Sequence, residues 1–367
     1  MKTIPIIFLL VMYVSGAALG ATTEGRRNRL AQRRRNTVDN SKVIYYRFHP
    51  DFSECKKKLF LKTTKTWEER TCIKFGRNDE DSDALVVAGN LKDDSECAFN
   101  PSSQGNDHYV FIGCGYFGGA AHEVGHALGL IYTHTRYDRE KYLTVNSTNV
   151  AREFRKYYDD LLRGQDENET RIKMHEKIQY GKSGTKSNYY GVPYDYGSIM
   201  HYGTADIDPP MVPTDEHHKR TMGSQFISFL DLLEVNKRHD CLGKCNPDDK
   251  ETVECEHQGY PNPKNCSDCV CPTGYGGRSC GDRPGDCGED LIAEERVKTK
   301  LLDISSPQNS SEYHVCTSWI KSAPDTKILV EIESISDELK TCGCGYAAVE
   351  IKTQDDQRLT GYRFCSK

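Results

Sequence analysis

The chain of 367 residues (41.6 kDa) is 37% apolar, 28% charged and 10% aromatic, which is too apolar and too aromatic for a disordered chain. Its net charge is −5, and because residues 1–35 hold Lys2 and six arginines against the single acid Glu24, residues 36–367 carry −11. That charge argues against binding to nucleic acid or anionic lipid. Sixteen cysteines, eleven of them from Cys245 onward, argue against a reduced cytosolic location.

The first residues predict a secretory signal peptide over 1–20. Lys2 precedes nine apolar residues, 6–14, and residues 18–20 are small enough for a signal peptidase. Nine apolar residues are fewer than the roughly 20 that a membrane helix needs, and no later segment is longer. We therefore expect a secreted protein without a membrane span.

Two arginine-rich runs follow directly. They predict a basic pro-segment over 21–35 that is removed by processing, so that the mature chain begins near Asn36.

The next elements alternate between short strands and helices, which predicts an α+β fold. We expect strands at 43–48, 71–75, 84–88 and 108–112, and helices at 54–69, at 119–128 and from 146 to 164. Gly129 stands where a helix C-terminus favours the left-handed conformation. Residues 165–195 are polar and rich in turn formers, so we expect mostly loop there.

The character of the chain changes after Cys241. Six cysteines within 245–280 predict a small module held by three disulfides. From Cys287 onward the pattern alternates, as in 328–332 and 347–351, which predicts strands of a β-sandwich-like module.

The most informative motif is His122-Glu123-Val124-Gly125-His126. Histidines four residues apart lie on one face of a helix, where both imidazoles can bind a single zinc ion. Glu123 can then act as general base on a water molecule at the metal.

The residues around this motif resemble those of the astacin family of metzincin proteases. Gly129 follows the helix, Arg136-Tyr137-Asp138-Arg139 matches the family's R-x-D-R segment, and residues 194–202 (YDYGSIMHY) look like its Met-turn. The resemblance covers about residues 40–242. Residues 259–277 in addition resemble an EGF-like module, and those from 287 onward a CUB module.

The resemblance implies a zincin catalytic domain over 36–242, an EGF-like module over 243–281 and a CUB-like module over 287–367 that is short, as a truncated module would be. It also implies the disulfides Cys72–Cys241, Cys97–Cys114 and Cys287–Cys316. The pairing of Cys55, Cys342, Cys344 and Cys365 stays open. Sequons at Asn146, Asn168, Asn265 and Asn309 fit glycosylated surface loops.

Carried over by motif, the family's roles fall on five residues. His122 and His126 would bind one zinc ion, Glu123 would be the general base, Met200 would form the apolar floor, and Tyr202 would stabilise the oxyanion.

The chain departs from the family at two adjacent positions. Tyr132 occupies the place of the third zinc-binding histidine, and Thr133 that of a glutamate which meets the mature N-terminus. Three outcomes are open: Tyr132 binds zinc as a phenolate, His134 bends in as the ligand, or the site binds metal weakly or not at all.

The resemblance also implies latency before processing. Astacin pro-segments usually place an aspartate on the zinc, whereas residues 21–35 contain none, so latency must work differently here. The first hypothesis is a secreted zinc endopeptidase that hydrolyses extracellular proteins, with EGF-like and CUB-like modules that position substrates or partners. The second is a secreted binding protein that keeps the protease fold without turnover, because of Tyr132.

Overall fold

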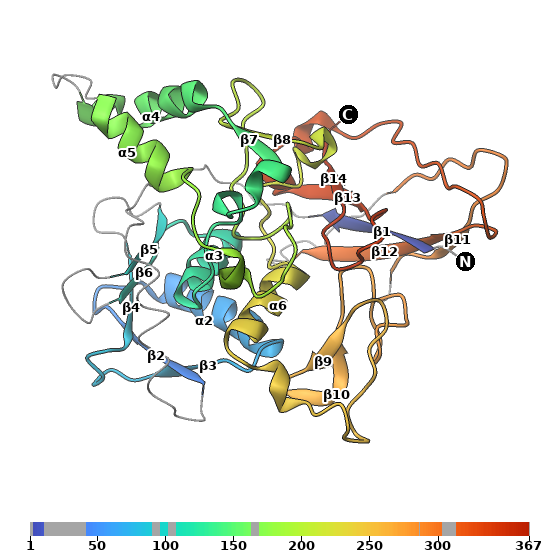
Figure 1. Ribbon diagram of the computed structural model, residues 1–367, viewed down its shortest axis with the longest axis horizontal. Helices are drawn as coiled ribbons and strands as arrows, with labels where there is room; N and C mark the ends of the chain where they lie inside the picture. The colour runs from blue at the N-terminus through green and yellow to red at the C-terminus, as the bar shows by residue number, and fades with distance from the viewer. Residues whose placement is uncertain are drawn as a thin grey trace.

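The computed structural model describes residues 3–10, 42–89, 96–101, 108–162, 169–285, 287–302 and 313–366. Figure 1 shows two sheets on either side of a group of helices. The helices are α2 (Glu54–Glu69), α3 (Phe117–Ala127), α4 (Ser147–Leu162), α5 (Glu169–Gln179) and α6 (Phe229–Arg238). The strands are β1 (Thr3–Leu10), β2 (Val43–Phe48), β3 (Lys74–Arg77), β4 (Leu85–Ala88), β5 (Cys97–Pro101), β6 (His108–Ile112), β7 (Leu143–Val145), β8 (Met211–Pro213), β9 (Tyr260–Asn262), β10 (Asn265–Val270), β11 (Asp290–Ile292), β12 (His314–Lys321), β13 (Ala347–Ile351) and β14 (Tyr362–Phe364).

The sheet of the N-terminal half has the strand order β3-β2-β4-β6-β5. Its first four strands are parallel, and β5 is an antiparallel edge strand beside β6. The predicted strand 43–48 and the predicted strand 108–112 are confirmed without a shift, whereas the strand predicted at 71–75 lies at Lys74–Arg77. No pattern in the sequence predicted β5, which contains Asn100 and Pro101. An edge strand tolerates such residues because one side of it needs no hydrogen bonds.

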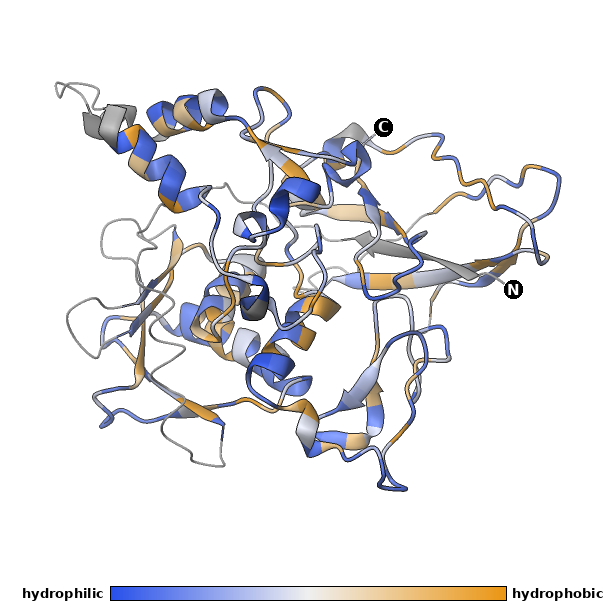
Figure 2. Cartoon of the chain, viewed as in Figure 1, coloured by the Kyte–Doolittle hydropathy of each residue, from blue (hydrophilic) through white to orange (hydrophobic). Residues whose placement is uncertain are grey.

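Helices α2 and α3 pack against each other beside this sheet. The indole nitrogen of Trp67, from α2, donates a hydrogen bond of 3.3 Å to the backbone oxygen of Ala121 in α3. Trp67, Phe60 and Val110 are fully buried in the same apolar core. Figure 2 shows that the strands of this sheet and α6 carry much of the apolar sequence. The core thus fixes α3, which bears the HExxH motif.

The prediction of mostly loop over 165–195 is wrong, because residues 169–179 form α5. Helix α5 lies beside α4 (Figure 1). Its sequence, ETRIKMHEKIQ, alternates polar and apolar residues without a clear helical stripe, and for this reason the pattern did not predict a helix. The C-terminal end of the predicted helix near 164 lies outside the described residues.

The disulfide-rich segment (residues 245–280) contains the hairpin β9–β10 and three disulfides, as predicted. The C-terminal segment (residues 287–366) contributes four strands to a sheet of order β11-β12-β1-β13-β14. Its remaining strand, β1, comes from the predicted signal peptide and pairs with both β12 and β13. The described residues of this segment form one sheet, not the two that a sandwich needs.

The predicted strand at 347–351 is confirmed as β13, but the strand predicted at 328–332 is wrong. Residues 328–332 lie outside the strands although their pattern alternates, and the Leu329 side chain is 91% exposed. Strand formation needs a free neighbouring edge as well as a suitable pattern, and β1 occupies the position between β12 and β13.

The predicted disulfides Cys72–Cys241, Cys97–Cys114 and Cys287–Cys316 are confirmed. The open pairing of Cys55, Cys342, Cys344 and Cys365 is answered in part by a disulfide between Cys344 and Cys365. Cys55 and Cys342 are free thiols in the part of the chain that is described. In those same residues, no helix is both long and apolar enough to cross a lipid bilayer.

Candidate active site

Helix α3 presents the residues of the HExxH motif. It ends at Ala127, and Gly129 reverses the chain with a φ of +93°, so that the Leu130 amide can donate to the Gly125 backbone oxygen at 3.0 Å. Gly125 lies on the helix face that meets Met200, where an added Cβ would be only 2.7 Å from the Met200 sulfur. The glycine therefore lets the Met-turn approach the helix closely.

The two histidines of the motif are held by their Nδ1 atoms. His122 Nδ1 lies 2.7 Å from the Ile199 backbone oxygen, and His126 Nδ1 lies 2.9 Å from the Leu130 backbone oxygen. A carbonyl accepts only, so each Nδ1 carries the proton and each Nε2 keeps its lone pair for a metal. The ring centroids are 4.7 Å apart. This places two imidazoles with the correct tautomer side by side.

Glu123 follows His122 on the same helix and is 8% exposed. This is the placement that a general base would need, beside one of the two histidines that the motif proposes as metal ligands.

Tyr132 lies against both imidazoles. Its ring centroid is 4.6 Å from that of His126 and 5.4 Å from that of His122, and the side chain is only 7% exposed. The backbone around it is fixed, because the Thr133 amide donates to the Met200 backbone oxygen at 3.0 Å. The structure thus brings the phenol to the third-ligand position that the motif spacing indicated.

His134 is placed differently. Its ring is fully buried and stacks on Tyr202, with 4.3 Å between the ring centroids. Nε2 lies 2.9 Å from the Gln179 backbone oxygen, and Nδ1 accepts from the Tyr202 amide at 3.4 Å. Burial lowers the pKa of His134 well below its usual value. Both ring nitrogens are used in packing the loop, which disfavours His134 as the third ligand.

The Met-turn supports this arrangement from below. Met200 is 1% exposed, and residues just before it are tied to the buried Asp231 of α6. Asp231 accepts from the Ser198 hydroxyl at 2.5 Å and from the Ile199 amide at 2.9 Å. Ser198 in turn accepts from the Thr133 hydroxyl at 2.9 Å. Thr133, where the family has a glutamate, therefore takes part in a hydrogen-bond chain that ends on the Asp231 carboxyl group.

Asp231 was missed by the sequence analysis. It forms a capping box with Ser228 at the start of α6, and burial raises its pKa to about 7. The pattern of Ser228 followed three residues later by an acid, before an apolar run, is a signal from which the helix start could have been found. Nothing in that local pattern indicates the link to Ile199, which is 32 residues away.

Tyr202 completes the group of aromatic rings. Its centroid is 4.7 Å from that of Tyr132 and 6.3 Å from that of His122. Its hydroxyl donates to the Gln179 side-chain oxygen at 3.1 Å. Gln179 ends α5, in the segment predicted as loop, so its contact with Tyr202 was also missed.

The R-x-D-R segment holds the loop between Tyr132 and β7. Arg136 forms a 2.9 Å ion pair with Asp138 and donates to the Val192 backbone oxygen at 3.1 Å; both members of the pair are largely buried. Arg139 donates to the backbone oxygens of His134 and Tyr180. These arginines cross-link the loops around the site and do not enter it.

The side chains present are suitable for zinc. Two imidazole nitrogens and one phenol oxygen form a mixed nitrogen and oxygen donor set of the kind that zinc accepts with three protein ligands and one open position. The Nδ1 hydrogen bonds of His122 and His126 supply the supporting contacts that such ligands require.

The helix with paired histidines and a neighbouring glutamate, the Met-turn beneath it and the flanking parallel sheet define a zinc peptidase of the metzincin class. A family model for astacin (peptidase family M12A) matches residues 31–170 and 165–240. The chain therefore belongs to the astacin family of zinc metalloproteases.

Two relatives come from Caenorhabditis elegans. Zinc metalloproteinase nas-31 is 32% identical over 94% of this chain and 54% of its own length, and zinc metalloproteinase nas-25 is 30% identical over 84% of this chain and 74% of its own length. The chain thus spans little more than half the length of nas-31. A solved structure, the hatching enzyme zinc-protease high choriolytic enzyme 1 of Oryzias latipes, is 24% identical with a TM-score of 0.42 and covers 54% of this chain and 89% of that one.

Proposed function

We propose that the chain is a secreted zinc-dependent endopeptidase that hydrolyses peptide bonds of extracellular proteins, with Tyr132 as the third ligand. One observation carries this proposal: the buried ring of Tyr132 lies against two imidazoles whose Nδ1 atoms are both held by backbone oxygens. A buried phenol ionises readily only when a cation lies beside it, so the position of Tyr132 against the imidazoles fits a metal ligand.

His122, His126 and Tyr132 would hold the ion. When bound, zinc supplies positive charge that acidifies a water molecule and polarises the scissile carbonyl. Glu123 accepts the proton of the attacking water at its carboxylate and later gives it to the leaving amine. Its burial next to His122 keeps the carboxylate oriented during both transfers.

Tyr202 would donate a hydrogen bond from its hydroxyl group to the developing oxyanion. In the structure this hydroxyl donates to Gln179 instead, so substrate binding must exchange one acceptor for the other. A phenolate at position 132 would donate more negative charge to a bound zinc ion than a neutral imidazole does. We therefore expect a less acidic water and slower turnover than with a third histidine.

The remaining parts of the chain fit an extracellular protein. We assign residues 1–20 to a signal peptide and 21–35 to a pro-segment, the disulfide-rich segment to an EGF-like module and the C-terminal segment to a CUB-like module. Seven disulfides support an oxidising compartment. The sequons at Asn146 and Asn265 are exposed, as glycosylation requires.

The test uses the full chain, secreted from a eukaryotic host and purified after processing. Cleavage of a denatured protein is measured with and without a chelator, beside Glu123→Gln, which keeps the shape of the base but not its charge. We expect cleavage by the native chain only, and its loss with chelator. Equal inertness of the folded, processed native chain and Glu123→Gln would overturn the proposal.

The alternative, a protease-fold binding protein without turnover, is motivated by Tyr132 alone. A second variant, Tyr132→His, distinguishes the peptidase from the binding protein. If Tyr132→His cleaves the substrate and the native chain does not, the native site lacks only its third imidazole, and the chain is a binding protein. If the native chain cleaves, Tyr132 is compatible with turnover.

A further inference from the structure

The C-terminal segment contacts the Met-turn of the catalytic domain at both ends. Before Met200, the Thr360 amide and hydroxyl donate to the two carboxylate oxygens of Asp195, at 3.2 and 2.9 Å. Asp195 is buried and also accepts from the Gly197 amide at 3.1 Å. A Cβ on Gly197 would lie only 2.3 Å from Thr360, so this glycine allows Thr360 to reach the turn.

The second contact comes directly after Tyr202. The Cys342 sulfur lies so close to Gly203 that an added Cβ there would be 2.0 Å from it, and the thiol lies 3.7 Å from the Thr204 backbone oxygen. Gly223 supports the thiol from the other side, where an added Cβ would be 3.2 Å from the sulfur. Cys342 is thus seated on the backbone that leaves Tyr202.

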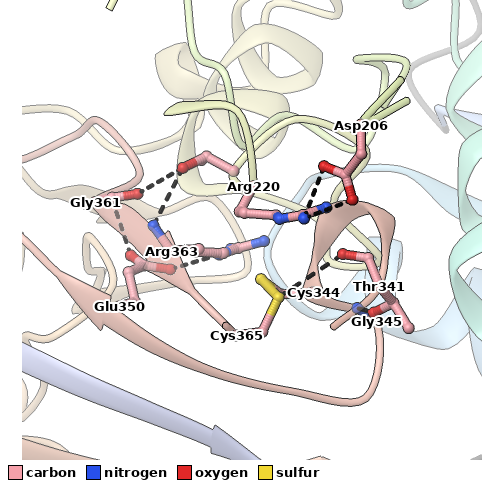
Figure 3. Close-up of a disulfide and its surroundings, with 10 residues drawn as sticks. Asp206, Arg220, Thr341, Cys344, Gly345, Glu350, Gly361, Arg363 and Cys365 are labelled. Atoms are coloured by element: carbon pink, nitrogen blue, oxygen red, sulfur yellow. Dashed lines mark hydrogen bonds and ion pairs between the residues drawn. A yellow bond between two sulfur atoms is a disulfide. The ribbon is translucent and has the colours of Figure 1, made fainter. Parts of the chain in front are cut away.

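Charged and disulfide-linked residues flank the turn that carries Cys342. Figure 3 shows the Cys344–Cys365 disulfide and, near it, the ion pairs Arg220–Asp206 and Arg363–Glu350. The disulfide Cys344–Cys365 fixes the turn that carries Cys342. Lys340 lies 3.4 Å from Asp206, four residues beyond Tyr202, and Arg220 pairs with the same carboxylate at 2.8 Å. Hydrogen bonds from Arg220, chiefly, and from Lys219 lower the pKa of Asp206 to about 2.

A second anchor joins the same segment to the loop before α6. Arg363 forms a buried ion pair of 2.8 Å with Glu350 and donates to the Ser224 hydroxyl at 2.7 Å. Its amide donates to the Thr221 hydroxyl at 3.2 Å. A buried, fully paired arginine fixes orientation, because any shift leaves a charge without its partner.

We propose that the C-terminal segment positions the oxyanion tyrosine: Thr360 and Cys342 bracket the Met-turn and hold the backbone from which Tyr202 projects. This inference rests on the proposed peptidase function. The segment is then part of the catalytic arrangement and does not serve only to bind substrates. Loss of either contact lets Tyr202 shift, which lowers the rate of the chemical step with little effect on substrate binding.

Two variants of the secreted full chain test each contact. Thr360→Val removes the hydroxyl that donates to Asp195, and Gly203→Ala pushes the backbone against the Cys342 sulfur. Thr353→Val is the matched control, because it makes the same change at an exposed position of the same segment. We expect kcat for a short peptide to fall about tenfold or more in both test variants, with KM within about twofold.

A suppressor separates positioning from general damage. Gly203→Ala combined with Cys342→Ala removes the sulfur, and the new methyl group, which would lie 2.0 Å from the position of that sulfur, takes its place in the contact. The double variant should therefore restore kcat to within about threefold of wild type. A loss of fold would leave this double variant as impaired as the single one.

A readout that needs no turnover keeps this inference distinct from the proposed function. The ¹⁹F resonance of 3-fluorotyrosine at position 202 should shift in Thr360→Val and Gly203→Ala, return in the double variant and stay unchanged in Thr353→Val. An inert native chain would contradict the peptidase function, but the ¹⁹F signal would still test whether Thr360 and Cys342 position Tyr202. Unchanged resonance and unchanged kcat in both folded single variants would overturn it.

Discussion

His122 and Asp231 are joined through one residue of the Met-turn. His122 Nδ1 lies 2.7 Å from the Ile199 backbone oxygen, while the Ile199 amide donates to Asp231 at 2.9 Å. A single peptide segment therefore transmits the position of a buried carboxylate in α6 to His122, a proposed zinc ligand in α3. Neither motif reveals this connection in the sequence.

Asp231→Asn tests that connection. Asparagine replaces one acceptor oxygen by an NH2 group, which would face the donors of Ser198, Ile199 or Ser228. We expect the free energy of unfolding to fall by about 2 kcal/mol, because at least one buried donor loses its partner. Urea denaturation measures this loss of stability, and an unchanged midpoint would show that the hydrogen bonds to Asp231 do not stabilise the fold.

The HExxH helix could be predicted from the sequence because its information is local. The spacing of His122 and His126 and the glycine at 129 specify a helix, its polar face and its end within eight residues. The strand at 43–48 and the helix at 54–69 have the same origin. The candidate site was therefore placed on this helix without tertiary information, and the resemblance to astacins assigned its third position to Tyr132.

The supporting residues could not be found in this way. Gln179, Asp231 and Thr360 contact Tyr202, Ile199 and Asp195, respectively, across 23, 32 and 165 residues of sequence. Such pairs depend on how elements pack and leave no periodic signal. The incorrect strand at 328–332 shows the converse, since a local pattern does not decide which edge is available.

Gly125→Ala tests the close approach of α3 and the Met-turn. The new methyl group would lie 2.7 Å from the Met200 sulfur in a fully packed core. Overpacking costs about 1–3 kcal/mol, and the better helix propensity of alanine offsets about 1 kcal/mol of this. We expect a net destabilisation of about 1 kcal/mol by urea denaturation. Gly243→Ala is the control, since an added Cβ there meets nothing within 4 Å; equal midpoints for the two variants would contradict the packing argument.

His218 makes the fold sensitive to acid. Its buried ring stacks between Tyr196 and Tyr362, with centroids at 4.2 and 4.4 Å, and burial lowers its pKa to about 4. The unfolded chain, with a histidine pKa near 6.5, binds the proton more readily, so stability is complete above pH 6.5 and falls as the pH drops toward 4. The expected loss is about 2.5 kcal/mol at pH 4.5.

His218→Phe keeps the stacking and cannot titrate. We expect the variant to lose less stability than wild type between pH 7 and pH 4.5, measured by urea denaturation at a series of pH values. Parallel curves of stability against pH for the two proteins would show that His218 does not cause the loss of stability in acid.

Removal of residues 1–20, the proposed signal peptide, should rearrange the C-terminal sheet. Strand β1 pairs with β12 and β13, and its Phe8 is in register with Cys316 and Val349. Val330 already packs in the same apolar cluster as Cys316 and Val349. We expect Ile328–Ile332 to pair with the vacated edges in the secreted chain.

Hydrogen exchange measures this directly. The amides of 328–332 should be protected in the processed chain and exchange rapidly in a chain whose signal peptide cannot be cleaved. Rapid exchange in both would show that another segment, or none, occupies the position between β12 and β13.

The measurement closest to the central claim is zinc affinity, determined by competition with a chromogenic chelator. The secreted chain should bind one zinc ion, and Tyr132→Phe should weaken binding at least about tenfold, or ~1.4 kcal/mol. Tyr137→Phe, the same change outside the site, should bind as wild type does. Equal affinities for wild type and Tyr132→Phe, or no zinc bound by the folded native chain, would contradict a site built from His122, His126 and Tyr132.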